Sequence, residues 1–194
     1  MIIAIKEQDR VIVAYSNTDY WGKLAEKDYV DEENVPIKFS KDGTLFGFAK
    51  MNCQSDMFIF DDDFINQDIT PKTVVKNVIP YIKKTLKKNG QALDEEGRWR
   101  NILTICNGNK IYDITTNFAF YEADDYVCHG FSVEILQSVL DDTIGMPAEE
   151  RIIKATSFAS KLHKEDLFPL IHNLFRDLHI YPHPFCDKAE GEVP

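Results

Sequence analysis

A cluster of possible metal ligands lies close to the C-terminal end of the sequence. His179, His183, Cys186 and Asp187 carry the nitrogen, sulfur and oxygen donors that zinc and related metals prefer. Two prolines make the intervening segment stiff and extended, so the four side chains are not expected to converge. A packed surface segment is therefore the favoured interpretation, and short motifs of this kind remain hypotheses.

Two further groups of residues have types that could do chemistry. Cys53 and His129 could form a nucleophile and base pair, but no pattern brings them together and cysteine is more often a buried packing residue. The runs Asp61-Asp62-Asp63 and Asp141-Asp142 could bind a divalent cation, but they lack the glycine-centred loop of a calcium site. We therefore expect neither a metal nor a cofactor.

The overall composition indicates a well-filled globular domain with an acidic surface. The chain has 194 residues, 44% of them hydrophobic, and its 22 Lys and Arg against 32 Asp and Glu give a formal charge of −10. This length suits a single domain, expected over residues 1–185, followed by an acidic and flexible tail at 186–194. Because the excess negative charge repels a phosphate backbone, nucleic acid is not an expected partner.

The hydrophobic segments are too short for a membrane protein. No run approaches the roughly 20 apolar residues needed to span a bilayer. The apolar start, residues 1–5, is interrupted by Lys6-Glu7 and lacks the basic region and cleavage site of a signal peptide. The four cysteines form no CxxC pair, which favours reduced thiols. We expect a cytoplasmic protein with no membrane contact.

Periodicity predicts an antiparallel β protein with helices in its middle and its C-terminal part. Strands are expected in hairpins at residues 3–15 and 37–49, in a third hairpin around Asn107-Gly108, and at 117–121 and 126–129. Helical spacing appears after Pro71, with Pro80 expected to bend the helix, and again over 135–140 and from 147 onward. A further amphipathic helix is expected at 167–178. The segment 52–69 is compatible with a helix or a strand, and neither is predicted there.

These elements match a four-layer αββα sandwich of the α+β class, with an extra C-terminal helix. The order and spacing over residues 1–163 resemble the proteasome β-subunit branch of the N-terminal nucleophile (Ntn) hydrolases. The resemblance rests on short segments in the same order as in that family, namely residues 2–5 with 11–16, Leu45-Phe46-Gly47-Phe48-Ala49, Ile111-Tyr112-Asp113-Ile114, Gly130-Phe131-Ser132 and Glu149-Glu150-Arg151-Ile152.

The resemblance implies a specific chemistry at the start of the first strand. The family cuts amides with an N-terminal Thr, Ser or Cys, whose own α-amino group serves as the base. The opening strand here begins with Met1, whose thioether has no proton to give up, and removing it would expose Ile2. Processing before Ser16 or Thr18 would destroy the strand itself.

The supporting positions implied by the resemblance also differ. The family's aspartate in the first hairpin is replaced by Tyr15, beside Ser16. The position of the family's catalytic lysine is occupied here by Pro36. Lys38 lies two residues later in the strand and therefore on the same strand face. The family's Gly-Ser-Gly becomes Gly130-Phe131-Ser132, with an aromatic ring where a small hydroxyl is expected.

The leading hypothesis is therefore a proteasome-like protein without its hydrolytic centre, with a structural, binding or regulatory role. The resemblance implies a homo-oligomer, and a related protein subunit is a possible partner. One alternative is an amidase or peptidase that uses Tyr15, Ser16, Lys38 or Ser132 in the same cleft. Another is a small-molecule binding module in which Phe131 and Tyr15 line the vacated pocket.

Overall fold

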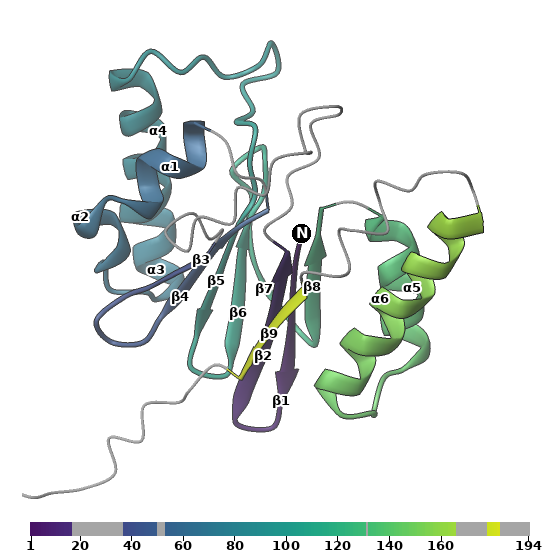
Figure 1. Cartoon of the computed structure of the whole chain (residues 1–194). Coiled ribbons are helices and arrows are strands. Elements are labelled where there is room, and N and C mark those ends of the chain that lie inside the picture. The colour runs from purple at the N-terminus through teal and green to yellow at the C-terminus, as the bar shows by residue number, and fades with distance from the viewer. Residues whose placement is uncertain (17–36, 50–52, 131, 166–177, 183–194) are drawn as a thin grey trace, which may run out of the picture.

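The computed structural model describes residues 1–16, 37–49, 53–130, 132–165 and 178–182. They form four layers, in which two antiparallel sheets face each other and helices cover the outer side of each (Figure 1). The predicted sandwich is confirmed. The acidic tail at 186–194 lies outside the described residues, as do Pro36 and Phe131.

The first sheet has the strand order β8-β1-β2-β9. The predicted N-terminal hairpin is confirmed, and its strands β1 (Ile2–Glu7) and β2 (Arg10–Ser16) form the centre of the sheet. On one side β1 pairs with β8 (Tyr126–His129), and on the other β2 pairs with β9 (Leu178–Pro182). Most of the predicted C-terminal helix lies outside the described residues. Leu178 was expected to be the last residue of that helix, and this assignment is wrong because Leu178 begins strand β9. A final strand is therefore present.

The second sheet has the order β3-β4-β5-β6-β7 and is built from chain neighbours. The hairpins predicted around residues 41–43 and 107–108 are confirmed. The strands are β3 (Ile37–Phe39), β4 (Leu45–Phe48), β5 (Leu103–Asn107), β6 (Lys110–Ile114) and β7 (Phe120–Ala123). A short turn at Asp124-Asp125 then carries the chain from β7 into β8 of the other sheet.

Helices α1 to α4 cover the second sheet. The undecided segment forms α1 (Cys53–Ile59) and α2 (Asp62–Ile65), and Asp61 caps α2 by accepting hydrogen bonds from two backbone amides. Beyond α3 (Pro71–Thr73), a π-helical turn η1 (Val74–Val78) precedes α4 (Ile79–Lys88). Pro80 lacks a backbone N–H, so the wider turn before it is the predicted disturbance of the helix. Buried aromatic rings such as Phe58 and Phe64, with centroids 4.9 Å apart, fill this layer.

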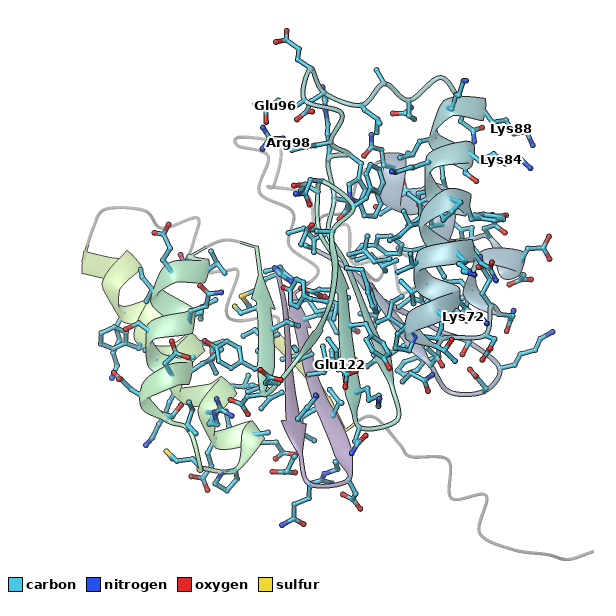
Figure 2. The ribbon with its side chains drawn as sticks, turned by 180° about the vertical axis from the view of Figure 1, so that it is seen from behind. Lys72, Lys84, Lys88, Glu96, Arg98 and Glu122 are labelled. Carbon is cyan, nitrogen blue, oxygen red and sulfur yellow. The ribbon has the colours of Figure 1, made fainter. Side chains whose placement is uncertain are left out.

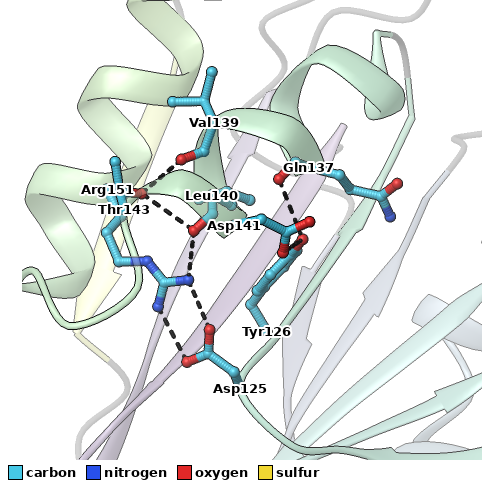
Figure 3. Close-up of polar contacts among 8 residues, drawn as sticks. All are labelled: Asp125, Tyr126, Gln137, Val139, Leu140, Asp141, Thr143 and Arg151. Atoms are coloured by element: carbon cyan, nitrogen blue, oxygen red, sulfur yellow. Dashed lines mark hydrogen bonds and ion pairs between the residues drawn. The ribbon is translucent and has the colours of Figure 1, made fainter.

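Helices α5 (Val133–Asp142) and α6 (Ala148–Glu165) cover the first sheet, close to the predicted positions. A polar network fixes them to the β7–β8 turn (Figure 3). The buried Arg151 donates to both carboxylate oxygens of Asp125, at 3.1 and 2.7 Å, and to the backbone oxygen of Leu140 at 2.9 Å. The Tyr126 hydroxyl donates to Asp141 Oδ1 at 2.7 Å. The network joins α5, α6 and the sheet.

Removing the Tyr126 hydroxyl tests that network. Tyr126→Phe is expected to lower the free energy of unfolding by about 0.5–1.5 kcal/mol, because the hydroxyl's contacts with Asp141 and the backbone oxygen of Gln137 are lost while the exposed Asp141 can still bind water. Chemical denaturation measures the change. An Asp141→Asn variant that keeps an acceptor should lose less, and an equal loss from both would contradict this account.

Candidate functional site

Two rows of cross-strand neighbours face each other between the sheets, at the end of the sandwich where β1 begins. We call these two rows the mouth layer. In the first sheet the row runs through His129, Ile2 and Tyr15. In the second sheet it runs through Ile37, Gly47, Thr104, Asp113 and Tyr121. The rows touch directly, since His129 Nε2 is hydrogen-bonded to Asp113 Oδ2 and Ile2 packs on Gly47.

The side chain that enters the mouth layer from the start of β1 is that of Ile2. It is fully buried in the cluster between the sheets, whereas Met1 packs against the cluster under α5 and α6. Successive residues of a strand point to opposite faces, so Met1 and Ile2 cannot both face the second sheet. Neither has an O–H or S–H group. Neither Met1 nor the first residue of β1, Ile2, therefore supplies a hydroxyl or thiol.

The two glycines of the predicted site lie against the start of β1. A Cβ atom on Gly130, whose φ is +120°, would come within 2.8 Å of Met1 Cα and 3.4 Å of its nitrogen. A Cβ atom on Gly47 would overlap Ile2 Cδ1. The structure thus places Gly130 against Met1 and Gly47 against Ile2, which fills the space above Gly47.

The lysine considered for the site points elsewhere. Lys38 is exposed and lies opposite Phe46, which belongs to the cluster under α1 to α4. Its neighbour Ile37 is the β3 residue that lies between the sheets. Lys38 is therefore on the face of the second sheet that is turned away from Ile2.

The remaining predicted positions surround the mouth layer. Tyr15 is 3% exposed, within the cluster between the sheets and in register with Ile2. Ser16 pairs with Leu178 at the end of β2. Ser132 has a left-handed backbone, with φ of 57°, just before α5.

A buried polar cluster centred on Asp113 is the part of the mouth layer that the sequence interpretation missed. Asp113 is fully buried, and its carboxylate accepts from the Thr104 hydroxyl and the Tyr121 hydroxyl, each at 2.7 Å. His129 Nε2 completes the set from the opposite sheet. An aspartate on the inward-facing side of an apolar strand, between Tyr112 and Ile114, was the available signal. His129 thus pairs with an aspartate, and the Cys53–His129 pair that was weighed and disfavoured on sequence is not tested, because the Cys53 side chain is not described.

The Asp113 cluster is buried between the sheets and influences the pKa values of nearby groups. Burial raises the pKa of Tyr121, and the Asp113 carboxylate raises it further. Burial also raises the pKa of the Cys106 thiol, again assisted by Asp113. The Asp113 carboxylate bonds to side chains from strands of both sheets, so the cluster joins the two sheets. Within the described part of the chain, no three His, Cys, Asp or Glu side chains are placed to hold a metal ion.

Cys106 and Cys128 are predicted to resist alkylation in the folded protein. Both are buried, and burial raises the pKa of Cys128 to about 12, so almost no reactive thiolate exists at neutral pH. Peptide mass mapping should find Cys106 and Cys128 labelled at least about a hundredfold faster after unfolding. Rapid labelling of either residue in the folded protein would contradict the burial described here.

The packing of Ile2 on Gly47 gives a prediction for a double-mutant cycle. Gly47→Ala should lower the free energy of unfolding by about 1–3 kcal/mol, because its methyl group overlaps Ile2 Cδ1. Ile2→Val removes that atom at a cost of about 0.5–1.5 kcal/mol, so Gly47→Ala should cost less when it is made in the Ile2→Val variant. Denaturant titration of the four proteins measures the coupling, and strictly additive effects would argue against this contact.

Solved structures with the same architecture identify the fold. BPH from Thiobacillus denitrificans superposes with a TM-score of 0.65 at 14% identity, over 95% of this chain and 99% of that one. A second BPH structure, in complex with epoxomicin, matches equally well. HslV from Trypanosoma brucei has a TM-score of 0.62 at 15% identity, over 93% and 97% of the chains. Anbu, an ancestral beta-subunit from Yersinia bercovieri, has 0.64 at 11%, over 94% and 81%. No protein-family model and no curated protein matches the sequence.

The chain has the proteasome-like fold of the Ntn hydrolases. The mouth layer lies beside the start of the first strand and next to Met1, the position at which the resemblance places the nucleophile. The other candidate groups have local roles. Asp61 accepts from the Tyr81 hydroxyl and caps α2, and Asp141 accepts from Tyr126. His179 lies on β9, while His183, Cys186 and Asp187 lie outside the described residues.

Proposed function

We propose that this protein is a proteasome-like relative that does not cut amides with an N-terminal nucleophile. Its role is structural, binding or regulatory, within a homo-oligomer that can include a related subunit. The observation that supports this proposal is the burial of Ile2 on Gly47 at the start of β1. An apolar side chain fills the space where a hydroxyl or thiol would have to stand.

Processing of the chain does not supply the missing group. Cleavage that leaves Met1 or Ile2 in first place exposes a thioether or an alkyl side chain, and neither forms an acyl intermediate. Cleavage before Ser16 would remove β1, which pairs with both β2 and β8 at the centre of its sheet. The nearest lysine on β3, Lys38, faces away from Ile2.

The proposed setting is an assembly in the cytoplasm. The description of Anbu as a beta-subunit supports a role as one subunit among several. Large apolar side chains are exposed on the side of the sandwich that α5 and α6 cover: Ile144 in the α5–α6 turn, and Ile153 and Phe158 on α6, the last at 48% exposure. No helix in the described part of the chain is long and apolar enough to cross a membrane. The net charge of −10 argues against a nucleic acid partner.

Epoxomicin provides a direct test, because BPH forms a complex with it. The purified full chain and BPH are incubated in parallel with epoxomicin and with a set of fluorogenic peptide amides. BPH serves as the positive control, and this protein is expected to give no adduct by intact mass and no amide cleavage. An adduct on the first residue would overturn the proposal. Labelling by a hydroxyl-directed or thiol-directed probe that is lost on Ser16→Ala or Ser132→Ala would instead support the amidase alternative.

A further inference from the structure

The sequence contains two Asn-Gly steps, Asn89-Gly90 and Asn107-Gly108, and neither belongs to the candidate site. At such a step the backbone nitrogen of the glycine can attack the side-chain carbonyl carbon of the asparagine, because glycine has no Cβ to obstruct the approach. The new C–N bond closes a succinimide ring, and the side-chain amide leaves as ammonia with the proton of the glycine N–H. Water then opens the ring to give aspartate or isoaspartate. Since the two steps have the same residues, their structural surroundings have to distinguish them.

The first step lies at an exposed helix end. Asn89 is the C-terminal cap of α4, and both Asn89 and Gly90 are exposed. The backbone N–H and the Nδ2 of Asn89 donate to the backbone oxygen of Thr85, at 3.1 and 2.9 Å. The Gly90 N–H donates to the backbone oxygen of Lys87 at 3.2 Å. These bonds lie within the last turn of one helix, so fraying of that turn frees the attacking nitrogen and the side chain without disturbing another element.

The second step is held by other parts of the fold. Asn107 is the last residue of β5 and pairs with Lys110 across the hairpin. Its Nδ2 donates at 2.9 Å to the backbone oxygen of Ile69, which lies 38 residues earlier in the chain. The residue before it, Cys106, is fully buried. Bringing the Asn107 side chain onto the Gly108 nitrogen therefore requires the hairpin and the contact with Ile69 to open.

The charge around the end of α4 favours the same reaction. Negative charge develops on the attacking nitrogen and on the carbonyl oxygen, and nearby cations stabilise it. Four exposed lysines line the last two turns of α4, and Figure 2 shows two of them, Lys84 and Lys88, pointing away from the molecule. Of the three carboxylates at residues 94–96, two are ion-paired with Arg98. The cap residue of α4 therefore has a positively charged neighbourhood.

We propose that Asn89 is a site of spontaneous deamidation in the folded protein and that Asn107 is protected from it. Conversion replaces the Nδ2 donor of Asn89 by a carboxylate oxygen, which cannot donate to the Thr85 carbonyl. It also places a negative charge at the negative end of the α4 dipole. The last turn of α4 is therefore looser in the converted protein than in the newly made chain. This inference goes beyond the proposed function and does not depend on it.

Peptide mapping of the full chain by mass spectrometry tests the proposal. The folded protein is aged at mildly alkaline pH, and aspartate and isoaspartate are measured at both steps over time. Conversion at residue 89 should be at least about tenfold faster than at residue 107, because opening a helix end costs less free energy than opening a hairpin. In denaturant the two rates should come close together. Equal rates in the folded protein, a faster rate at residue 107, or no conversion at residue 89 would overturn the proposal.

Variants at the cap residue identify the reaction and its consequence. Asn89→Gln keeps a side-chain amide but needs a larger ring, so conversion at this position should stop, and continued conversion would exclude the succinimide route. In Asn89→Asp, which represents the converted protein, amide hydrogen exchange at Gly90 should be at least about threefold faster than in the unmodified chain. Asn109→Asp, in the exposed β5–β6 turn, adds the same charge elsewhere and should leave this exchange rate unchanged. Equal exchange rates in Asn89→Asp and the unmodified chain would overturn the expected loosening.

Discussion

Asp113→Ala is expected to lower the free energy of unfolding by about 3–5 kcal/mol. The substitution removes the acceptor shared by Thr104, Tyr121 and His129, which reach it from strands of both sheets. The Tyr121 hydroxyl can turn to water because its side chain is 42% exposed, but Thr104 is fully buried and is left without its partner. Chemical denaturation followed by circular dichroism measures the loss.

Two matched variants separate the causes of this loss. Asp113→Asn keeps the shape and one acceptor oxygen but removes the charge, and it should cost about 1–3 kcal/mol. Asp142→Ala, at an exposed aspartate of α5, should change stability by less than about 0.5 kcal/mol. If Asp113→Ala were as mild as Asp142→Ala, the cluster would not be joining the sheets.

Gly130→Ala is the second substitution with a large expected effect, a loss of about 2–4 kcal/mol. The backbone at Gly130 has φ of +120°, which side-chain-bearing residues rarely adopt, and the added Cβ would lie 2.8 Å from Met1 Cα. The close contact is with backbone, so it cannot be relieved by rotating a side chain. Either β1 or the loop leading to α5 has to shift.

Gly90→Ala is the matched control for Gly130→Ala. Gly90 also has a positive φ, of +67°, but a Cβ there would meet no atom within 4 Å. Its substitution should therefore cost only the backbone strain, about 1 kcal/mol. Equal losses at the two glycines would show that the contact with Met1 contributes nothing to stability.

Local patterns were sufficient to predict most of the fold. The Asn107-Gly108 turn and the alternation on either side of it define β5 and β6, and Pro80 marks the π-helical turn before α4. Helices α1 and α2 were not predictable because the apolar run at residues 57–60 is continuous and shows neither the hydrophobic period of a helix nor that of a strand. Leu178 was assigned to a helix because it lies at helical spacing from the preceding apolar residues. That spacing carries no information about the pairing of Leu178 with Ser16 of β2, which is far away in the sequence.

The candidate site was only partly predictable, for a related reason. The resemblance implied that Met1, Gly47 and Gly130 are positions of one site; in the structure Gly130 lies against Met1 and Gly47 against Ile2. Which side chains face the gap depends on strand register. The pairing of Ile37 with Gly47 turns Lys38 outward, and the facing of the two sheets brings His129 onto Asp113. Neither register nor sheet stacking can be read from a single strand.

The identity of the first residue of the mature protein tests the central claim most directly. The protein is purified from its native cell, its intact mass and N-terminal residue are determined, and the same sample is assayed for amide cleavage. We expect a mature chain whose first strand starts with Met1 or Ile2 and which cleaves no amide. A mature form that begins with Thr, Ser or Cys and hydrolyses a peptide amide would contradict the account.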